Sequence, residues 1–180
     1  MRVSAKADYA ARAAAELATA TDAPIKSDRI AEAQDIPAKF LETILLELKH
    51  AGIVRSQRGP DGGYFLARPP EEISLADVIR AVDGPLANVR GDRPENMEYH
   101  GAAQPLTDVW IAVRAALREI LESTSLADLR DGTLPHRVSD LADDPEAWIS
   151  LGRIRGAGPS AVSGQGGRGR GQPKVSSARS

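Results

Sequence analysis

The chain has 180 residues, enough for one domain with a sizeable core or for a small domain with an extension and a tail. It contains no cysteine, which excludes disulfides, thiolate zinc sites and cysteine-ligated clusters; with no run of ~18 apolar residues and no signal-peptide core, we expect a cytoplasmic protein. The net charge of −2 divides into +1 for residues 1–68, −9 for 69–151 and +6 for 152–180, so the first segment and the tail are the parts that a polyanion would meet.

The first 50 residues predict three helices joined by short turns. Ser4 is placed to cap the first helix, whose apolar positions keep to one face. Ser27 is placed to cap a helix of about two turns, and Asp35 ends it, because Asp accepts the left-handed backbone of a tight turn. The third helix runs from Pro37 to His50. A short helix, a tight turn and a longer helix form the helix-turn-helix pattern.

The third helix has two unlike faces. Its apolar stripe, which we expect to be buried, consists of Phe40, Leu41, Ile44, Leu45 and Leu48. The opposite face carries Lys39, Glu42 and Thr43. In a major groove Lys39 and Thr43 can touch base edges or phosphates, and Glu42 can accept a hydrogen bond from cytosine N4. The alternative is an ordinary solvated helix face.

A β-hairpin is predicted directly after these helices. The segments IVRSQR and YFLAR have strand character, and the turn GPDGG separates them. A hairpin in this position is a wing, whose glycines allow a sharp turn and whose arginines can reach phosphates or the minor groove. The expected wing contacts, with a plain surface hairpin as the alternative, are Arg58, Gly59, Gly62, Gly63 and Tyr64.

Further DNA contacts are expected from the first two helices. Ser27 and Arg29 are placed to bind phosphate at the start of the second helix, where Ser27 could also be only a cap. Arg2 and Lys6 lie at the start of the first helix and could reach the DNA backbone.

Beyond the hairpin the pattern predicts a helix, a long loop and a longer helix. Ser74 and Asp77 form a capping box, and the same tetrapeptide SLAD recurs at 125–128. Residues 85–105 show no periodicity, which indicates a functional or mobile loop. The next segment has an apolar row that we expect to form a subunit interface: Leu106, Val109, Trp110, Val113, Leu117, Ile120 and Leu121.

The expected fold is therefore mainly α with a small β-hairpin. Residues 1–84 form a winged helix-turn-helix domain, 85–105 a loop that is the candidate sensing region, and 106–151 a dimerisation helix with a short C-terminal helical segment. Residues 152–180 have the composition of a disordered tail rich in Gly, Arg and Ser. The tail either adds nonspecific affinity for nucleic acid or is a solvated extension.

These segments resemble the Rrf2 family of bacterial winged-helix transcription regulators over roughly residues 1–125. The stretches that carry the resemblance are FLETILLELKHAG and SQRGPDGGYFLARPPEEISLADVIRAVDG. The resemblance implies a homodimer that is joined through the long helix, binds double-stranded DNA at an imperfect palindrome and usually represses transcription.

One departure from the family pattern concerns the cofactor. Many members hold a cluster through three cysteines in the loop after the AVDG helix, where this chain has Met97, Glu98, Tyr99 and His100. Asp8 lies where some members donate a carboxylate, but a carboxylate without thiolates does not hold an iron–sulfur cluster. We therefore expect no cofactor and no metal. Cysteine-free members resemble the family's cysteine-metabolism repressors, which bind no cluster and respond through a partner enzyme of sulfur metabolism.

No sequence motif favours an enzyme. The chain has no nucleophile elbow, P-loop, dinucleotide fingerprint or zinc signature, and GPDGG lies in a hairpin rather than between a strand and a helix. The alternative to a DNA-binding regulator is a winged helix that serves as a protein-interaction or RNA-binding module. Affinity for a palindromic site that falls steeply with salt separates the two.

Overall fold

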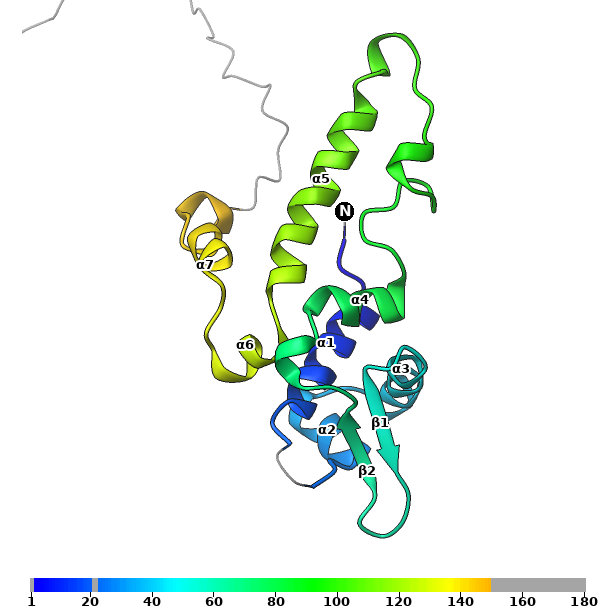
Figure 1. The fold of residues 1–180 in the computed structure, drawn as a ribbon, viewed down its shortest axis with the longest axis vertical. Helices are drawn as coiled ribbons and strands as arrows, with labels where there is room; N and C mark the ends of the chain where they lie inside the picture. The colour runs from blue at the N-terminus through cyan, green and yellow to red at the C-terminus, as the bar shows by residue number, and fades with distance from the viewer. Residues whose placement is uncertain (1, 21–22, 150–180) are drawn as a thin grey trace, which may run out of the picture.

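The computed structural model describes residues 2–20 and 23–149 and confirms a mainly helical fold with one small β-hairpin (Figure 1). The predicted tail of residues 152–180 lies outside the described residues. Short 3-10 turns lie at Pro70–Glu72, Pro94–Asn96, Gly101–Ala103 and Pro145–Trp148. The helices and strands are α1 Ala5–Leu17, α2 Ser27–Gln34, α3 Ala38–His50, β1 Val54–Gln57, β2 Gly63–Leu66, α4 Leu75–Asp83, α5 Leu106–Ser123, α6 Leu126–Asp131 and α7 His136–Ala142.

Helices α1 to α4, α6 and the hairpin pack together at the bottom of Figure 1, and we call this part the lower body. Helix α1 forms its centre, where it contacts α2, α3, α4 and α6. Ser4 caps this helix as predicted, since its side chain accepts a hydrogen bond from the Ala7 backbone N–H. The buried side of α1 consists mostly of alanine, so the neighbouring helices can approach it closely. These helices complete one core with Ile30, Leu41, Ile44, Leu45, Leu48, Ile73, Val78 and Leu126.

The helix-turn-helix forms at the predicted turn, with two corrections. Asp35 has the expected left-handed backbone, with φ 48° and ψ 51°. The expectation that Ser27 caps α2 was wrong, because the capping position is Lys26 and Ser27 is the first helical residue. The expectation that Phe40 is buried was also wrong. It is 61% exposed because it lies about 100° around the helix from Leu41, at the margin of the buried stripe.

The hairpin is antiparallel, and its register is fixed at both ends. Val54 pairs with Leu66 at the base, and Gln57 pairs with Gly63 beside the turn. The segment before α2 adds a short bridge to the outer side of β2, where Ile25 and Tyr64 exchange two backbone hydrogen bonds of 3.0 and 2.9 Å. The hairpin projects from the lower end of the molecule, and the bridge ties it to the start of α2 (Figure 1).

Helices α4 and α6 begin with the same structure, as the repeated SLAD tetrapeptide predicts. Capping boxes form at Ser74 with Asp77 and at Ser125 with Asp128. Two backbone hydrogen bonds join the two helix starts. The Leu75 N–H donates to the Thr124 carbonyl at 2.8 Å, and the Leu126 N–H donates to the Ile73 carbonyl at 2.9 Å. The end of α5 is thereby attached to the lower body.

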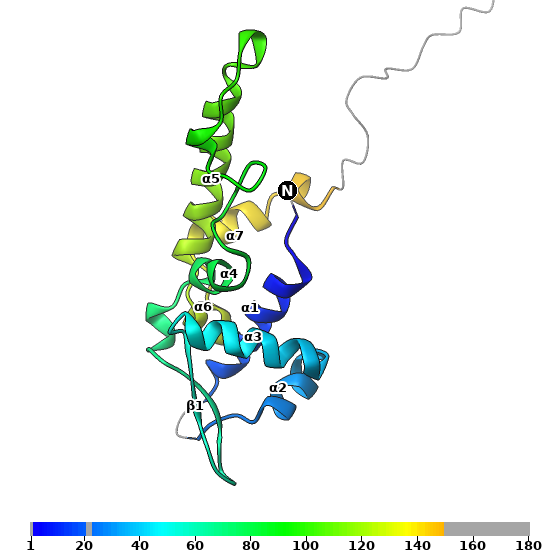
Figure 2. The same cartoon turned by 90° about the vertical axis from the view of Figure 1, so that its right-hand side faces the viewer.

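Helix α5 rises away from this body, and residues 84–105 run beside it (Figures 1 and 2). None of its residues is buried. The adjoining loop contains two 3-10 turns and the buried Pro94. Among the described helices, none combines the length and apolarity that crossing a membrane requires.

Candidate nucleic-acid interface

The wing follows directly from α3, so the two elements have a fixed relative orientation (Figure 2). Ile53 N–H donates to the Leu48 carbonyl at 2.9 Å, and Ala67 N–H donates to the Ile53 carbonyl at 2.8 Å. The Lys49 ammonium also donates to the Ser56 hydroxyl at 2.7 Å across the junction of α3 and β1. A surface that uses both elements is therefore pre-organised.

The predicted reading face of α3 is exposed. Lys39, Glu42 and Thr43 all lie on the solvent side, and in the described part of the chain neither Lys39 nor Glu42 forms an ion pair. Leu41, Ile44, Leu45 and Leu48 are buried on the opposite side and fix the rotation of the helix. The Thr43 hydroxyl donates to the Lys39 carbonyl at 3.5 Å, and the side chains of this outer face can donate, accept and make apolar contacts with DNA.

The predicted wing residues divide into exposed and structural positions. Arg58 and Gly59 are exposed at the turn, and Gly59 has a φ of +113°, which an L side chain rarely adopts. A Cβ on Gly62 would lie 2.5 Å from the Gln57 carbonyl oxygen, and a Cβ on Gly63 would lie 2.6 Å from the Ile25 carbonyl oxygen. Both glycines therefore allow close backbone approach, and half-buried Tyr64 packs against the core.

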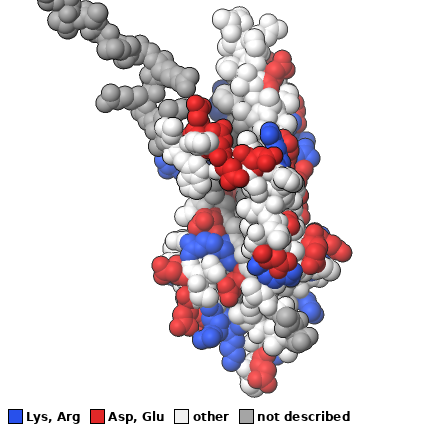
Figure 3. Space-filling view, turned by 90° about the vertical axis from the view of Figure 1, so that its left-hand side faces the viewer, with Lys and Arg blue, Asp and Glu red and all other residues white. Residues whose placement is uncertain are grey.

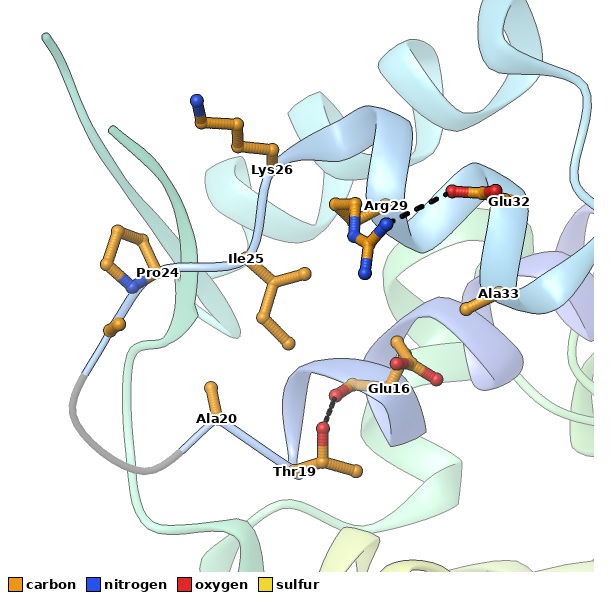
Figure 4. Close-up of a pocket in the computed structure, with 10 residues that line it drawn as sticks. Glu16, Thr19, Ala20, Pro24, Ile25, Lys26, Arg29, Glu32 and Ala33 are labelled. Carbon is orange, nitrogen blue, oxygen red and sulfur yellow. Dashed lines mark hydrogen bonds and ion pairs between the residues drawn. The ribbon is translucent and has the colours of Figure 1, made fainter. Parts of the chain in front are cut away.

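The start of α2 borders a cavity of about 620 Å³ between the end of α1 and residues 23–26 (Figure 4). Arg29 points across this cavity toward Glu32, with 3.4 Å between guanidinium nitrogen and carboxylate oxygen, whereas Lys26 points away (Figure 4). Glu16 accepts a hydrogen bond of 2.7 Å from Gln34. Of the described residues that line this cavity, Glu16 and Glu32 are acidic and Lys26 and Arg29 are basic. Ser27 is half-buried, and the bridge between Ile25 and Tyr64 holds this start of α2 beside the wing.

The structure does not bring Arg2 and Lys6 to this surface. The Lys6 ammonium lies 3.0 Å from the Glu47 carboxylate and thus joins α1 to α3. Arg2 precedes α1 beside Asp83 and Leu117, at the end of α1 that lies away from the wing (Figure 1).

Two candidate contacts beyond the predicted set lie on the same surface. Leu46 is 53% exposed on the outer face of α3, one turn after Glu42 and Thr43, where an apolar side chain can contact a thymine methyl group. Arg55 is exposed on β1, and its guanidinium lies 4.6 Å from the centre of the Phe65 ring. The helical spacing of the sequence is enough to place Leu46 on the outer face of α3. The position of Arg55 could not be found in this way, because it depends on the register of the hairpin.

The side that carries α6 and α7 has a different charge. Asp140, Asp143, Asp144 and Glu146 lie in or after α7, and Figure 3 shows acidic atoms gathered in the upper half of this side and mixed charges below. The acidic cluster in and after α7 repels a polyanion, so we do not expect DNA to bind there.

The chain is similar to known transcriptional regulators along most of its length. Residues 3–132 match the family model Rrf2, described as an iron-dependent transcriptional regulator. An HTH-type transcriptional regulator of Mycobacterium tuberculosis is 53% identical over 151 residues, which are 83% of this chain and 94% of the relative. CymR of Bacillus subtilis is 34% identical over 134 residues, which are 74% and 92% of the two chains.

Solved structures agree with the sequence relatives. CymR of B. subtilis, described as its global cysteine regulator, has a TM-score of 0.63 at 32% identity, over 74% of this chain and 98% of CymR. IscR of T. potens has a TM-score of 0.60 at 32% identity, over 73% and 88% of the two chains. These relatives are regulators rather than enzymes.

The family description names iron, but the residues of this chain do not fit a cysteine-ligated iron–sulfur cluster. The chain has no cysteine, and Asp8 pairs with Arg12 at 3.2 Å. In the loop, Met97 sulfur accepts from Arg90 at 3.6 Å, and the Tyr99 hydroxyl accepts from the Trp110 indole at 3.1 Å. Within residues 2–20 and 23–149 no group of three His, Asp or Glu side chains could hold a metal ion.

Proposed function

The chain belongs to the Rrf2 family of winged helix-turn-helix transcriptional regulators, and from this premise we propose that it is a homodimeric repressor of a palindromic operator that works without an iron–sulfur cluster. The observation that carries the proposal is the exposed outer face of α3, held in fixed orientation beside an exposed wing. The test is whether the protein protects an inverted repeat in DNA.

In the proposed complex each subunit places α3 in a major groove and its wing along the neighbouring backbone. Lys39, Glu42 and Thr43 face the base edges, while Arg58 and the backbone at Gly59 contact phosphates. Ser27 and Arg29 reach the phosphate backbone from the start of α2. Half-sites then lie about one helical turn apart.

The apolar face of α5 supports the proposed dimer. All seven residues of the predicted row are half-buried or exposed in the single chain, and Val109 is 47% exposed. Leu117 and Leu121 border a mostly apolar hollow of about 360 Å³ between α5, α4 and the N-terminal segment. A helix from a second copy can cover this row and fill the hollow, which removes apolar surface from water.

We place the regulated genes in sulfur or cysteine metabolism as part of the same proposal. CymR, which is described as a global cysteine regulator, aligns with this chain along most of both lengths. The chain has no cysteines that could ligate a cluster, which fits a regulator that works without one. The genes beside the protected operator test the assignment directly.

The Lys39→Ala variant tests the reading face. We expect its operator affinity to fall about tenfold with a partial loss of preference between related operators, because a base-edge contact contributes about 1–3 kcal/mol. Fluorescence anisotropy with the operator and single-base variants measures both effects. Unchanged affinity and preference would contradict the assignment of this face.

The Arg58→Ala variant tests the wing. We expect the affinity to fall about fivefold on every DNA sequence, because one phosphate contact is removed. For the same reason the slope of log K against the logarithm of the salt concentration should become shallower by about one. The matched control is Arg90→Ala, an exposed arginine in the loop beside α5, which should bind DNA like the parent. Equal behaviour of the two variants would place the wing outside the interface.

A further inference from the structure

A second cavity, of about 530 Å³, lies between α4, the loop that follows it and one face of α5. Its polar lining comes from three separate parts of the chain: Arg80 of α4, Asn88, Arg93 and Glu95 of the loop, and Arg114 and Arg118 of α5. Arg114 and Arg118 are four residues apart and therefore lie on the same face of α5, to one side of its apolar row. This volume is within the usual range for small-molecule sites.

The cavity carries an excess of positive charge. Four guanidinium groups and the Glu95 carboxylate line it. At its edge Glu122 adds a negative charge, while Asp77, which also pairs with Arg80, is offset by Arg68, so the net charge is +2. Glu122 accepts from Arg80 and lies 2.9 Å from Arg118, while Glu95 lies 2.6 Å from Arg114. Within the described part of the chain Arg93 forms no ion pair.

Both carboxylates are held in their charged form. The pKa of Glu122 lies below its usual range because the side chain accepts hydrogen bonds from Arg80 and Arg118. The pKa of Glu95 is lowered by a hydrogen bond from its own backbone N–H and by another from Arg114. The ion pairs fix the directions of three guanidinium groups, those of Arg80, Arg114 and Arg118.

We propose that this cavity, which we name the arginine cavity, binds a small metabolite with at least two negative charges on oxygen, such as a phosphate ester or a polycarboxylate. Guanidinium groups match carboxylate and phosphate oxygens in pairs of hydrogen bonds, and the Asn88 amide adds a further donor. A single negative charge would leave the site with uncompensated positive charge.

The cavity is connected to the DNA-binding domain, and this step rests on the proposed function. Asp77 lies 3.8 Å from Arg80 and 4.0 Å from Arg68, and its carboxylate also accepts from the Ser74 backbone N–H at the start of α4. Arg68, just past the wing, donates to the Glu72 carbonyl at 3.0 Å. An anion that competes with Glu122 and Asp77 for Arg80 therefore changes the contacts that join α5, α4 and the base of the wing.

The test of the site uses the full chain without DNA and pyrophosphate as the probe. Isothermal titration calorimetry should give saturable binding of pyrophosphate, and acetate at matched ionic strength should give none. We expect Arg93→Gln to weaken pyrophosphate binding at least about tenfold, because a charge-assisted contact is lost. The control Arg90→Gln changes an arginine of the same loop outside the cavity and should bind like the parent.

Two results would overturn the site: no saturable heat with pyrophosphate or with citrate, or equal weakening in the Arg93 and Arg90 variants. Calorimetry is preferred to a melting shift because multivalent anions stabilise many proteins without a site. The link to DNA is measured separately, as operator affinity with and without saturating pyrophosphate at constant ionic strength, with an expected change of at least about threefold. An unchanged operator affinity would contradict the link but not the site, and absence of any operator would instead contradict the proposed function.

Discussion

The double substitution Val109→Asp and Val113→Asp is expected to convert the protein to a monomer and to lower operator affinity at least about 100-fold, because two half-sites are then no longer bound as one unit. Both side chains belong to the apolar row of α5, where none of the residues is buried within a single chain. The substitutions place charges in the proposed interface, where their desolvation opposes association. Light scattering after gel filtration measures the mass, and anisotropy measures the affinity.

The control for this experiment is Ala115→Asp. Ala115 is exposed on the opposite side of α5 from the apolar row, so a single charge there should leave both the dimer and its DNA affinity unchanged. Because the fold of the lower body does not depend on Val109 or Val113, both proteins should have the circular dichroism of the parent. A double variant that remains dimeric would exclude this face of α5 as the interface.

Gly63→Val is expected to separate the wing from α2 and to lower the free energy of unfolding by about 2–3 kcal/mol. The new Cβ would lie 2.6 Å from the Ile25 carbonyl oxygen and 2.8 Å from its carbonyl carbon, and both of these are backbone atoms that cannot rotate away. The two backbone hydrogen bonds between Ile25 and Tyr64 should break. DNA affinity should fall about tenfold on every sequence, because the wing loses its orientation.

Gln57→Val is the matched control, since Gln57 pairs with Gly63 in the hairpin and is exposed. It adds the same side chain at the same level of the hairpin without a backbone collision. Urea unfolding and amide hydrogen exchange at Ile25 and Tyr64 distinguish the two variants. If Gly63→Val retained the protection of these amides and the parent stability, the bridge would not be what anchors the wing.

Local signals explain why the elements near the wing could be predicted. Asp35 accepts the left-handed turn, both SLAD segments form capping boxes, and the five-residue glycine turn sets the hairpin. Each of these depends on residues that are close in sequence. The rotation of α3 also follows from periodicity, which places Lys39 outside.

Features that depend on tertiary packing could not be predicted in the same way. A Cβ at Gly63 would collide only because Ile25 crosses β2, and this contact joins parts of the chain that are distant in sequence. Lys6 was considered for DNA, but α1 packs so that it reaches Glu47. The arginine cavity combines Arg80 with Arg114, which lie in two helices separated by a long loop without periodicity.

The central claim is that this chain recognises a specific palindrome without a metal cofactor. The most direct measurement is selection of genomic fragments by the purified full chain at roughly physiological salt in the presence of a chelator, followed by footprinting of the enriched DNA. We predict one shared inverted repeat, with protected half-sites about one helical turn apart and unchanged protection after iron is added. Enrichment without a shared site, or protection that appears only after iron is supplied, would contradict this account.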